Sequence, residues 1–457
     1  MSEFRSYNRE QAFLLPPSLK DWLPPGDLAY FIADVVESLD LSQIERYYKV
    51  QTGPEGATRA KANSGQPAFH PRVMVALLLY GYCLGTASSR RLAWLAERDA
   101  GYRVVAANEQ PNFRTLSEFR RIHLKALKGL FVQVLHLARE AGLVKLGHVA
   151  LDGTKVKANA SKHKAMSYER LCQKEAEYAR QVEELLERAQ RTDEAEDAQY
   201  GKDRRGDELP EELRFREGRL KKIRQAKQAL EAAAQQKARA EGKLDEPGEP
   251  KPPRWGRPAA KPPGTPEPKA QRNFTDPESR IMKMGNGSFD QAYNCQAAVD
   301  AGSQIIVAAK ATNAPNDKQH VEPMVKQIEE NLGQRPDQLS ADSGYYSEAN
   351  VRYLRQARID DYLCPDRIQH GETPPLVRGR IPKGLSFINR VRRKLLLKTG
   401  RRIYALRKET VEPIFGQIKQ ARGLRQFLLR GMDKVRGEWS LWCTTHNLLK
   451  LWAAPTG

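Results

Sequence analysis

Cysteine is scarce in this sequence of 457 residues, and the few that occur are spread far apart. The five lie at positions 83, 172, 295, 364 and 443, with no Cys-x-x-Cys pair among them. Histidine is scattered in the same way, and none of the eight has a partner at metal-ligand spacing. The wide spacing of the cysteines excludes a cysteine zinc site and fits a reducing cytosol.

Long hydrophobic runs are also missing. The N-terminus, MSEFRSYNREQAFLLPPS, has no basic start followed by a long apolar stretch. The most apolar segment, VMVALLLYGYCLG, is too short to cross a bilayer. We therefore expect a soluble, cytoplasmic protein without a membrane partner.

Acidic residues are in deficit, because 56 Asp and Glu face 76 Lys and Arg, which gives a net charge of +20. Such an excess indicates a polyanionic partner, most simply DNA or RNA. A solvated basic surface, or a protein that coats RNA, is the plainer interpretation. Between Arg378 and Arg436, 18 Lys or Arg stand against three acids, and this clustering favours a nucleic-acid groove.

The length allows two or three domains, and the first, residues 1–145, is predicted to be all helical and to bind DNA. Its clearest helix is predicted to begin at Thr115, where Thr-Leu-Ser-Glu forms a capping box. Arg120 and Arg121 lie early in this helix. An arginine-rich helix after two shorter ones resembles a helix-turn-helix DNA reader, and an ordinary bundle with a charged exterior is the alternative. Helical spacing does not separate the two.

Four segments follow. Residues 146–165 contain a predicted strand, HVALDGTKVKA, and residues 166–245 repeat apolar side chains at helical spacing, which predicts an antiparallel helical hairpin. Residues 246–272 hold nine of the 28 prolines and are expected to form an extended linker. In residues 273–457, AYNCQAAVDAG and QIIVAAKATNA predict a β-hairpin, and alternating helices and strands complete an α/β fold with one mixed sheet.

Three carboxylates stand out in this frame. Asp152 and Asp342 each end a short apolar run, and Glu412 opens a basic helix. Mg²⁺ and Mn²⁺ prefer oxygen ligands, and two such ions about 4 Å apart can activate a nucleophile and stabilise the leaving oxygen of a phosphodiester. Because Gly or Ser-Gly follows each aspartate, turn formation is the alternative role. Other acids have no comparable claim, among them Asp290, Asp300, Asp317 and Asp366.

The basic helix places a lysine seven residues after its acid. Glu412 and Lys419 are two helical turns apart, so both would project from one face, roughly 10 Å from each other. Glu412 could then bind metal while Lys419 holds a DNA phosphate. The alternative is a surface pair on an amphipathic helix.

These residues carry a resemblance to a known family. With Asp152, the phrases ADSGYYS at 341–347 and VEPIFGQIK at 411–419 resemble bacterial insertion-sequence transposases of the DDE type, whose catalytic core is ribonuclease-H-like. In that family the first Asp lies on the first strand, the second just after the fourth, and the Glu on a late helix. The resemblance implies that Asp152, Asp342 and Glu412 are catalytic metal ligands, with Asp152 bridging two Mg²⁺ or Mn²⁺ ions.

Relatives also carry a Tyr, Arg, Glu, Lys signature around the third acid. Tyr404 and Arg407 keep the family spacing to each other, and so do Glu412 and Lys419. The join between the two pairs is one residue longer, so either Arg407 or Lys408 could fill the basic role. The resemblance implies that these residues position DNA phosphates.

The implied fold is a ribonuclease-H-like mixed sheet with flanking helices, preceded by the helical N-terminal domain and interrupted by the helical hairpin. The implied function is binding of double-stranded DNA at terminal inverted repeats, cleavage, and joining of the 3′ hydroxyl ends to target DNA. A homodimer and association with the nucleoid are expected in the active complex. The alternatives are a metal-dependent nuclease or resolvase on the same fold, and a non-catalytic DNA-binding protein derived from a transposase.

Overall fold

The computed structural model of the chain describes residues 18–48, 68–200, 211–243, 262–365, 375 and 377–454, with the side chains of 188–190, 192–200 and 211–213 excepted. The chain divides into two compact units. The first unit comprises Met1–Val156, Asn294–Leu429 and Asp433–Gly457. The second comprises Lys157–Tyr293 and Arg430–Met432.

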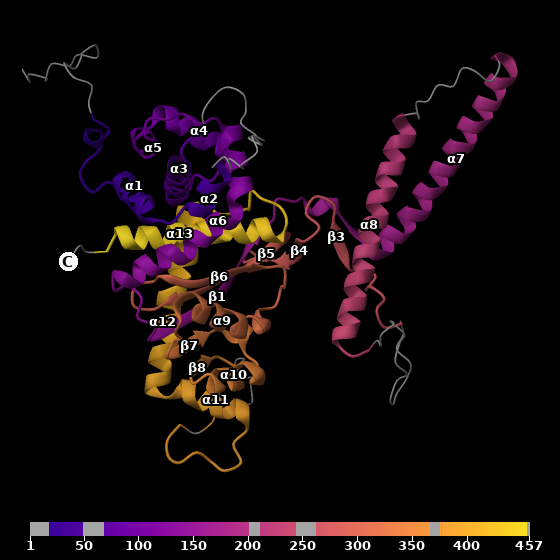
Figure 1. Cartoon of the computed structure of the whole chain (residues 1–457). Helices are drawn as coiled ribbons and strands as arrows, with labels where there is room; N and C mark the ends of the chain where they lie inside the picture. Colours follow the sequence, from indigo (N-terminus) through magenta and orange to yellow (C-terminus); the bar gives the residue numbers. More distant parts are fainter. Residues whose placement is uncertain are drawn as a thin grey trace, which may run out of the picture. The chain divides into compact units, whose positions relative to one another are not determined.

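The N-terminal part of the first unit is helical, as predicted (Figure 1). At its centre one helix begins with a proline at its first position, where the missing N–H is not needed, and the His70 side chain caps it. Nearly every residue of that helix is buried. The helices of this part are α1 (Leu28–Ser38), α2 (Ser42–Tyr48), α3 (Pro71–Cys83), α4 (Ser89–Arg98), α5 (Ala100–Val105) and α6 (Phe113–Glu140).

The start of α6 differs from the prediction. The helix begins at Phe113, and the Asn112 side chain accepts hydrogen bonds from the backbone N–H groups of Arg114 and Thr115, both at 2.9 Å. Thr115 is therefore inside the first turn and is not the cap. Asparagine caps helices as well as threonine does, and its position three residues earlier decides the start.

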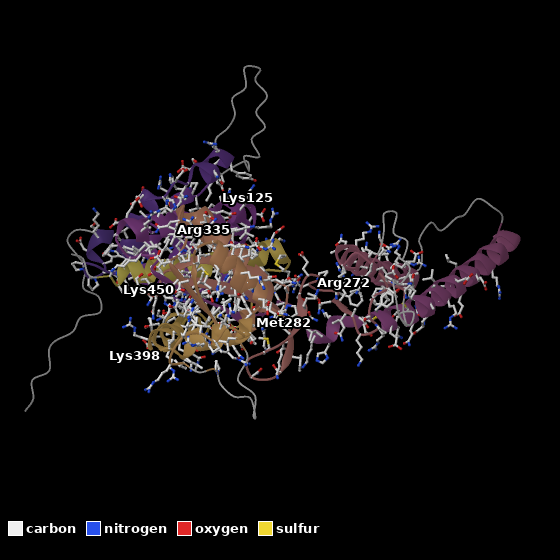
Figure 2. The ribbon with its side chains drawn as sticks, turned by 90° about the horizontal axis from the view of Figure 1, so that it is seen from below. Lys125, Arg272, Met282, Arg335, Lys398 and Lys450 are labelled. Carbon is white, nitrogen blue, oxygen red and sulfur yellow. The ribbon has the colours of Figure 1, made fainter. Side chains whose placement is uncertain are left out.

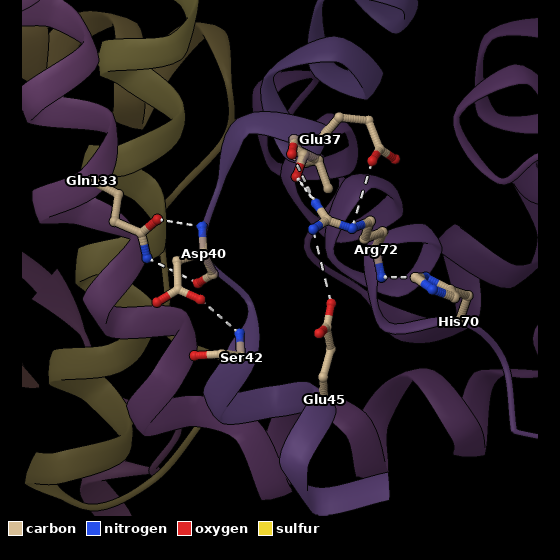
Figure 3. Close-up of polar contacts among 8 residues, drawn as sticks. Glu37, Asp40, Ser42, Glu45, His70, Arg72 and Gln133 are labelled. Carbon is tan, nitrogen blue, oxygen red and sulfur yellow. Dashed lines mark hydrogen bonds and ion pairs between the residues drawn. The ribbon is translucent and has the colours of Figure 1, made fainter. Parts of the chain in front are cut away.

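Polar contacts hold the ends of these helices together (Figure 3). From α3, the Arg72 guanidinium donates to the Val36 carbonyl at the end of α1, at 2.6 Å, and lies 3.9 Å from the Glu45 carboxylate of α2. From α6, the Gln133 amide exchanges two hydrogen bonds with the backbone of Asp40, at 2.8 and 3.1 Å. The loop between α1 and α2 is thereby fixed to α3 and α6.

The first unit also contains a mixed sheet, with strand order β6-β5-β1-β7-β8. Strands β1 and β7, and β7 and β8, run parallel, whereas β5 and β6 form the predicted antiparallel hairpin. The first strand continues five residues beyond Asp152, so this acid lies inside the strand and not at its end as expected. The strands are β1 (His148–Lys157), β5 (Phe289–Asp300), β6 (Ile306–Thr312), β7 (Gln338–Ala341) and β8 (Asp360–Leu363).

Helices pack on this sheet (Figure 1). One of them, α12, contacts β7 and β8, and α9 contacts β6. Figure 2 labels Lys398 at the start of α12 and Lys450 near the end of α13. The helices are α9 (Val321–Leu332), α10 (Glu348–Gln356), α11 (Phe387–Leu396), α12 (Lys398–Gly416) and α13 (Met432–Trp452).

The C-terminal helix α13 is part of the core, as its sequence predicted. Trp439 is fully buried, and its indole N–H donates to the Gln296 carbonyl of β5 at 3.2 Å. Asn447 of the same helix bonds the neighbouring strand β6. Its side-chain amide accepts from the N–H of Ile306 and donates to the carbonyl of Ile306, each at 2.9 Å. The helix therefore anchors the β5–β6 hairpin.

We predict that Trp439→Ala lowers the free energy of unfolding by about 3–5 kcal/mol, because a large buried ring leaves a cavity. The matched control is Trp452→Ala near the exposed end of the same helix, which should change it by less than about 1 kcal/mol. Chemical denaturation followed by circular dichroism measures both. Equal losses in the two variants would contradict this view of the core.

In the second unit, α7 (Tyr168–Tyr200) and α8 (Glu211–Ala240) run antiparallel and pack against each other. Leu171, Ile223 and Ala226 form a buried cluster between them. The Glu175 carboxylate of α7 pairs with Arg224 and Lys227 of α8, at 3.2 and 2.8 Å.

Short strands complete this unit, and Figure 2 labels Arg272 and Met282 on two of them. Of the predicted linker, residues 246–261 lie outside the described residues. Its final residues are not a free linker, because the Ala270 carbonyl accepts from the Tyr168 N–H at 2.8 Å and β3 begins directly after it. The strands are β2 (Ala165–Ser167) and β3 (Gln271–Asn273), which pair antiparallel, and β4 (Arg280–Lys283), which pairs with the first half of β5.

Across the described ranges, every helix is too short or too polar to cross a membrane.

Candidate active site

Asp152 lies in the middle of β1 with 18% of its side chain exposed. One carboxylate oxygen accepts from the Gly153 N–H at 2.7 Å, and the other accepts from Arg407 Nη1 at 3.1 Å. Burial raises the pKa of Asp152 to about 6, and the nearby carboxylates of Asp342 and Asp317 add to the increase. The Gly153 N–H and the Arg407 guanidinium oppose it. The net increase means that burial outweighs the stabilisation that Gly153 and Arg407 give to the charged form of Asp152.

Asp342 comes next to Asp152 through the register of the sheet. Leu151 of β1 pairs with Ala341, the last residue of the parallel strand β7, and each acid directly follows one member of this pair. The Asp342 carboxylate accepts from the Gly344 N–H at 2.9 Å and caps a short 3-10 turn. The fold thus brings together two acids that are 190 residues apart in sequence.

Glu412 lies on α12, with 55% of its side chain exposed. Its carboxylate is 3.8 Å from Arg407 Nη2, while Nη1 of the same guanidinium holds Asp152. Arg407 is buried between the two acids, whereas Lys408 is exposed. The tertiary structure therefore places Arg407 at the acids, where the sequence left both residues open.

Tyr404 stands one helical turn before Arg407. Its ring centroid is 5.7 Å from the Arg407 guanidinium carbon. Burial raises the pKa of Tyr404 to about 12, with Cys364 as the next contributor. Tyr404 therefore remains a neutral hydroxyl near neutral pH.

Lys419 lies in a different kind of helix from Glu412. A π-helical turn, Gln417–Ala421, follows α12, and its wider winding shifts the direction of the side chains. The Lys419 ammonium donates to the Thr154 hydroxyl at 2.9 Å and to the Lys155 carbonyl at 3.2 Å. Burial lowers the pKa of Lys419. The lysine thus reaches β1 two residues beyond Asp152.

A fourth acid, Asp317, lies near the pair, although sequence reasoning gave it no claim. It begins a short 3-10 helix after β6. One of its oxygens accepts from the side-chain amides of Asn294 at 2.6 Å and Gln296 at 2.8 Å. The only sequence signal for Asp317 is that an acid follows a strand by a few residues. Asp342 also follows a strand, so both aspartates have this signal. By contrast, the Asp300 carboxylate accepts from the Leu146 N–H at 2.7 Å and holds a loop.

The two arginines proposed to contact DNA in the N-terminal helices differ in burial. Arg120 is 5% exposed and donates to the Tyr82 hydroxyl at 3.1 Å and the Ala87 carbonyl at 2.8 Å. These partners hold its guanidinium inside the helical region, and a contact of Arg120 with DNA stays a prediction. Arg121 is exposed and pairs with Glu118. Its role stays a prediction.

The donor chemistry of the site suits a hard cation, because the ligands available are carboxylate oxygens. Burial is the first cause of the raised pKa of Asp152, and a cation close to this carboxylate would lower that pKa. Within the described ranges, however, no three His, Cys, Asp or Glu side chains are grouped as a metal-binding set. Asp152 and Glu412 do not face a common empty space, because the Arg407 guanidinium lies between them and contacts both carboxylates.

Comparison with known families places these features in a class. Residues 260–448 match the family described as Transposase DDE domain, and residues 17–121 match Transposase domain (DUF772). The two matches span well over half of the chain, and both define the class as DNA transposases. The chain belongs to the insertion-sequence transposases of the DDE type.

The matches cover the acids unequally. Asp342 and Glu412 lie within the first match, and Asp152 lies outside both. No curated protein and no solved structure matches the chain. The role of Asp152 therefore has to be argued from its place in the sheet.

We predict a pH-dependent effect of Asp152→Asn on metal-free protein. Below pH 3.8 the carboxyl is protonated in both folded and unfolded chains, and above pH 6 it is ionised in both. In the folded state the charge is disfavoured, so the parent should lose up to about 3 kcal/mol of stability relative to the variant as pH rises between these values. Urea unfolding with a chelator, at several pH values from 4 to 7, measures this.

The matched control is Asp433→Asn, whose side chain is 98% exposed. The difference in unfolding free energy between Asp433→Asn and the parent should not change in this way between pH 4 and 7. A pH-independent difference between Asp152→Asn and the parent would show that burial does not raise this pKa.

Proposed function

We propose that this transposase cleaves DNA and joins the 3′ hydroxyl ends to target DNA with Asp152, Asp342 and Glu412 as its catalytic acids. The observation that carries the proposal is the position of Arg407, which contacts both Asp152 of β1 and Glu412 of α12. Asp342 joins them through the register of β1 and β7. Arg407 thus links Asp152 with Glu412, and the register of the sheet brings Asp342 beside Asp152.

The order of strands supports a ribonuclease-H-like core. Counted along the first unit, β1 is the first strand, the β5–β6 hairpin supplies the second and third, and β7 is the fourth. Asp152 lies on the first strand, Asp342 directly follows the fourth, and Glu412 lies on a late helix. The resemblance noted in the sequence implies these three positions.

We infer that Asp152 and Asp342 hold two Mg²⁺ or Mn²⁺ ions, with Glu412 as a further ligand. When bound, the ions would polarise the attacking oxygen and stabilise the leaving oxygen of the phosphodiester. For Glu412 to reach them, the Arg407 guanidinium must turn from the acids towards a DNA phosphate. A guanidinium suits that exchange, because its fork binds carboxylate and phosphate alike.

Other basic groups near the acids would hold the DNA backbone. Lys419 brings an ammonium to β1 beside Asp152, and Tyr404 offers a neutral hydroxyl. Lys408 is exposed on α12 and is free to meet a phosphate further out. Neutralising the phosphate charge near the acids lowers the repulsion between DNA and carboxylates.

We infer that the helical region, predicted as residues 1–145, binds the terminal inverted repeats. Arg121 stays a candidate contact, and Arg90 and Arg114 line a depression between α4 and α6. Two DNA ends must be held together for joining, so a homodimer is expected in the active complex. The helix pair α7–α8, predicted as an insertion over residues 166–245, is a candidate for contacting DNA or a second subunit.

The test is Mg²⁺-dependent cleavage of DNA that carries the ends flanking this chain's own gene. Asp152→Asn, Asp342→Asn and Glu412→Gln should each lose about 100-fold or more of the rate, because each removes charge from the site. Binding of the same DNA should stay within about threefold of the parent. Glu409→Gln, a neighbour on α12, is the control and should cut normally.

Each other outcome points to a different function. Normal cutting by Glu412→Gln would remove it from the set of ligands. Cutting without joined products would favour a metal-dependent nuclease or resolvase. A parent that binds ends and never cuts them would favour a DNA-binding protein derived from a transposase.

We predict that Arg407→Ala lowers cleavage by about 10- to 100-fold, because the guanidinium orients Asp152 and Glu412. Lys408→Ala is the matched control and should stay within about threefold. Removing Arg407 also removes a cation that lowers the pKa of Asp152, so the acid limb of the pH profile should move to higher pH. A larger loss in Lys408→Ala would assign the basic role to Lys408.

A further inference from the structure

Four buried or half-buried polar side chains form a connected network beside the acids. Asn294 and Gln296 are two residues apart on β5, so their side chains share one face of the sheet, and both are fully buried. Gln296 donates to Asn294 at 3.1 Å, and its amide oxygen accepts from the Tyr345 hydroxyl. Asp317 receives both amide groups on one oxygen, at 2.6 Å from Asn294 and 2.8 Å from Gln296.

This network packs closely against the backbone of Gly153, the residue after Asp152. A Cβ atom on Gly153 would lie 2.5 Å from Gln296 Nε2 and 3.1 Å from the Tyr345 hydroxyl oxygen. No side chain fits there, so the strand approaches the network as closely as a backbone can. Because side chains alternate along a strand, Asp152 and Gly153 face opposite sides of β1. The network therefore forms the support behind Asp152.

The same network reaches the turn that follows Asp342. A Cβ atom on Gly344 would lie 3.0 Å from Asp342 Oδ1 and 3.5 Å from Asp317 Oδ2. The Gly344 N–H is also the donor that holds the Asp342 carboxylate. Tyr345, the next residue, is fully buried and bonds Gln296. One network thus contacts the backbone beside both aspartates.

Asp317 is the anchor of this network. Both of its amide donors meet a single oxygen, Oδ1, so one acceptor atom fixes the side chains of Asn294 and Gln296. Among the described residues, Asp317 forms no ion pair with Lys or Arg. Its charge is therefore held by hydrogen bonds alone, and it adds to the field that raises the pKa of Asp152.

We propose that Asp317 is a positioning residue that clamps Asn294 and Gln296, and that this clamp sets the distance between Asp152 and Asp342. The inference rests on the proposed function of these two aspartates as metal ligands. It adds a residue outside the acidic triad, and its role is mechanical. The hydrogen-bond acceptor at position 317 is what counts, and the charge is secondary.

Two substitutions separate these roles. Asp317→Ala removes the acceptor and releases both amides, whereas Asp317→Asn keeps one carbonyl oxygen in the same place and removes the charge. Asp433→Asn serves as the control for loss of an exposed acid. Each full-length variant is tested by hydrogen exchange without metal, by titration with Mn²⁺ alone followed by electron paramagnetic resonance, and by DNA cleavage.

In Asp317→Ala we expect the amides of Gly153 and Gly344 to exchange about tenfold faster or more, because the support behind them opens locally. Mn²⁺ affinity and cleavage should fall by about 10- to 100-fold. Asp317→Asn should stay within about threefold of the parent in all three measurements. Unfolding midpoints of both variants, measured in parallel, identify any global loss of structure.

Equal losses in Asp317→Asn and Asp317→Ala would overturn the clamp and assign the effect to the charge. Unchanged exchange in Asp317→Ala would overturn it outright. If Asp317→Ala does not fold, Tyr345→Phe, which removes only the hydroxyl on Gln296, should still speed exchange at Gly153. A parent that neither binds Mn²⁺ nor cuts DNA would refute the proposed function, and the exchange data would still decide the clamp.

Discussion

Asp152 carries its carboxylate in the middle of a strand and largely out of water, where the charged form is disfavoured. The groups around it modify this penalty. Burial raises its pKa to about 6, and Asp342 and Asp317 add negative charge nearby. Only the Gly153 N–H and the Arg407 guanidinium oppose this. Burial is therefore the largest cause of the increase, and the charges of neighbouring groups act on the pKa in both directions.

The late helix and the turn after it bring two cations to β1. From α12, Arg407 reaches Asp152, and from the π-helical turn after it, Lys419 reaches Thr154. Residues 152 and 154 project from the same face of β1, so a single continuous segment lines that face. Lys419 belongs to the π-helical turn Gln417–Ala421, which follows α12 directly. The opposite face of β1 is held by the network around Asp317.

Burial separates residues that look equivalent in the sequence. Arg120 and Arg121 are neighbours with the same chemistry, yet one is inside the helical region and the other is exposed. On α12, Arg407 is likewise buried and the adjacent Lys408 is exposed. Successive residues on a helix point about 100° apart, so adjacent basic residues meet different environments. Which of them is buried and which is exposed depends on the packing of the whole helix.

The sequence by itself determined the elements with strong local signals. The strand at Asp152, the β5–β6 hairpin, the helical N-terminal region and the buried C-terminal helix all followed from periodicity and turn residues, and the phrases around Asp342 and Glu412 pointed to the family. Only the tertiary structure decided the capping of α6 by Asn112, the π-helical turn that contains Lys419 and the burial of Arg407 beside Asp152 and Glu412. It alone showed Asp317 beside the pair of aspartates. These features depend on contacts between residues far apart in the chain, and local propensity carries no information about such contacts.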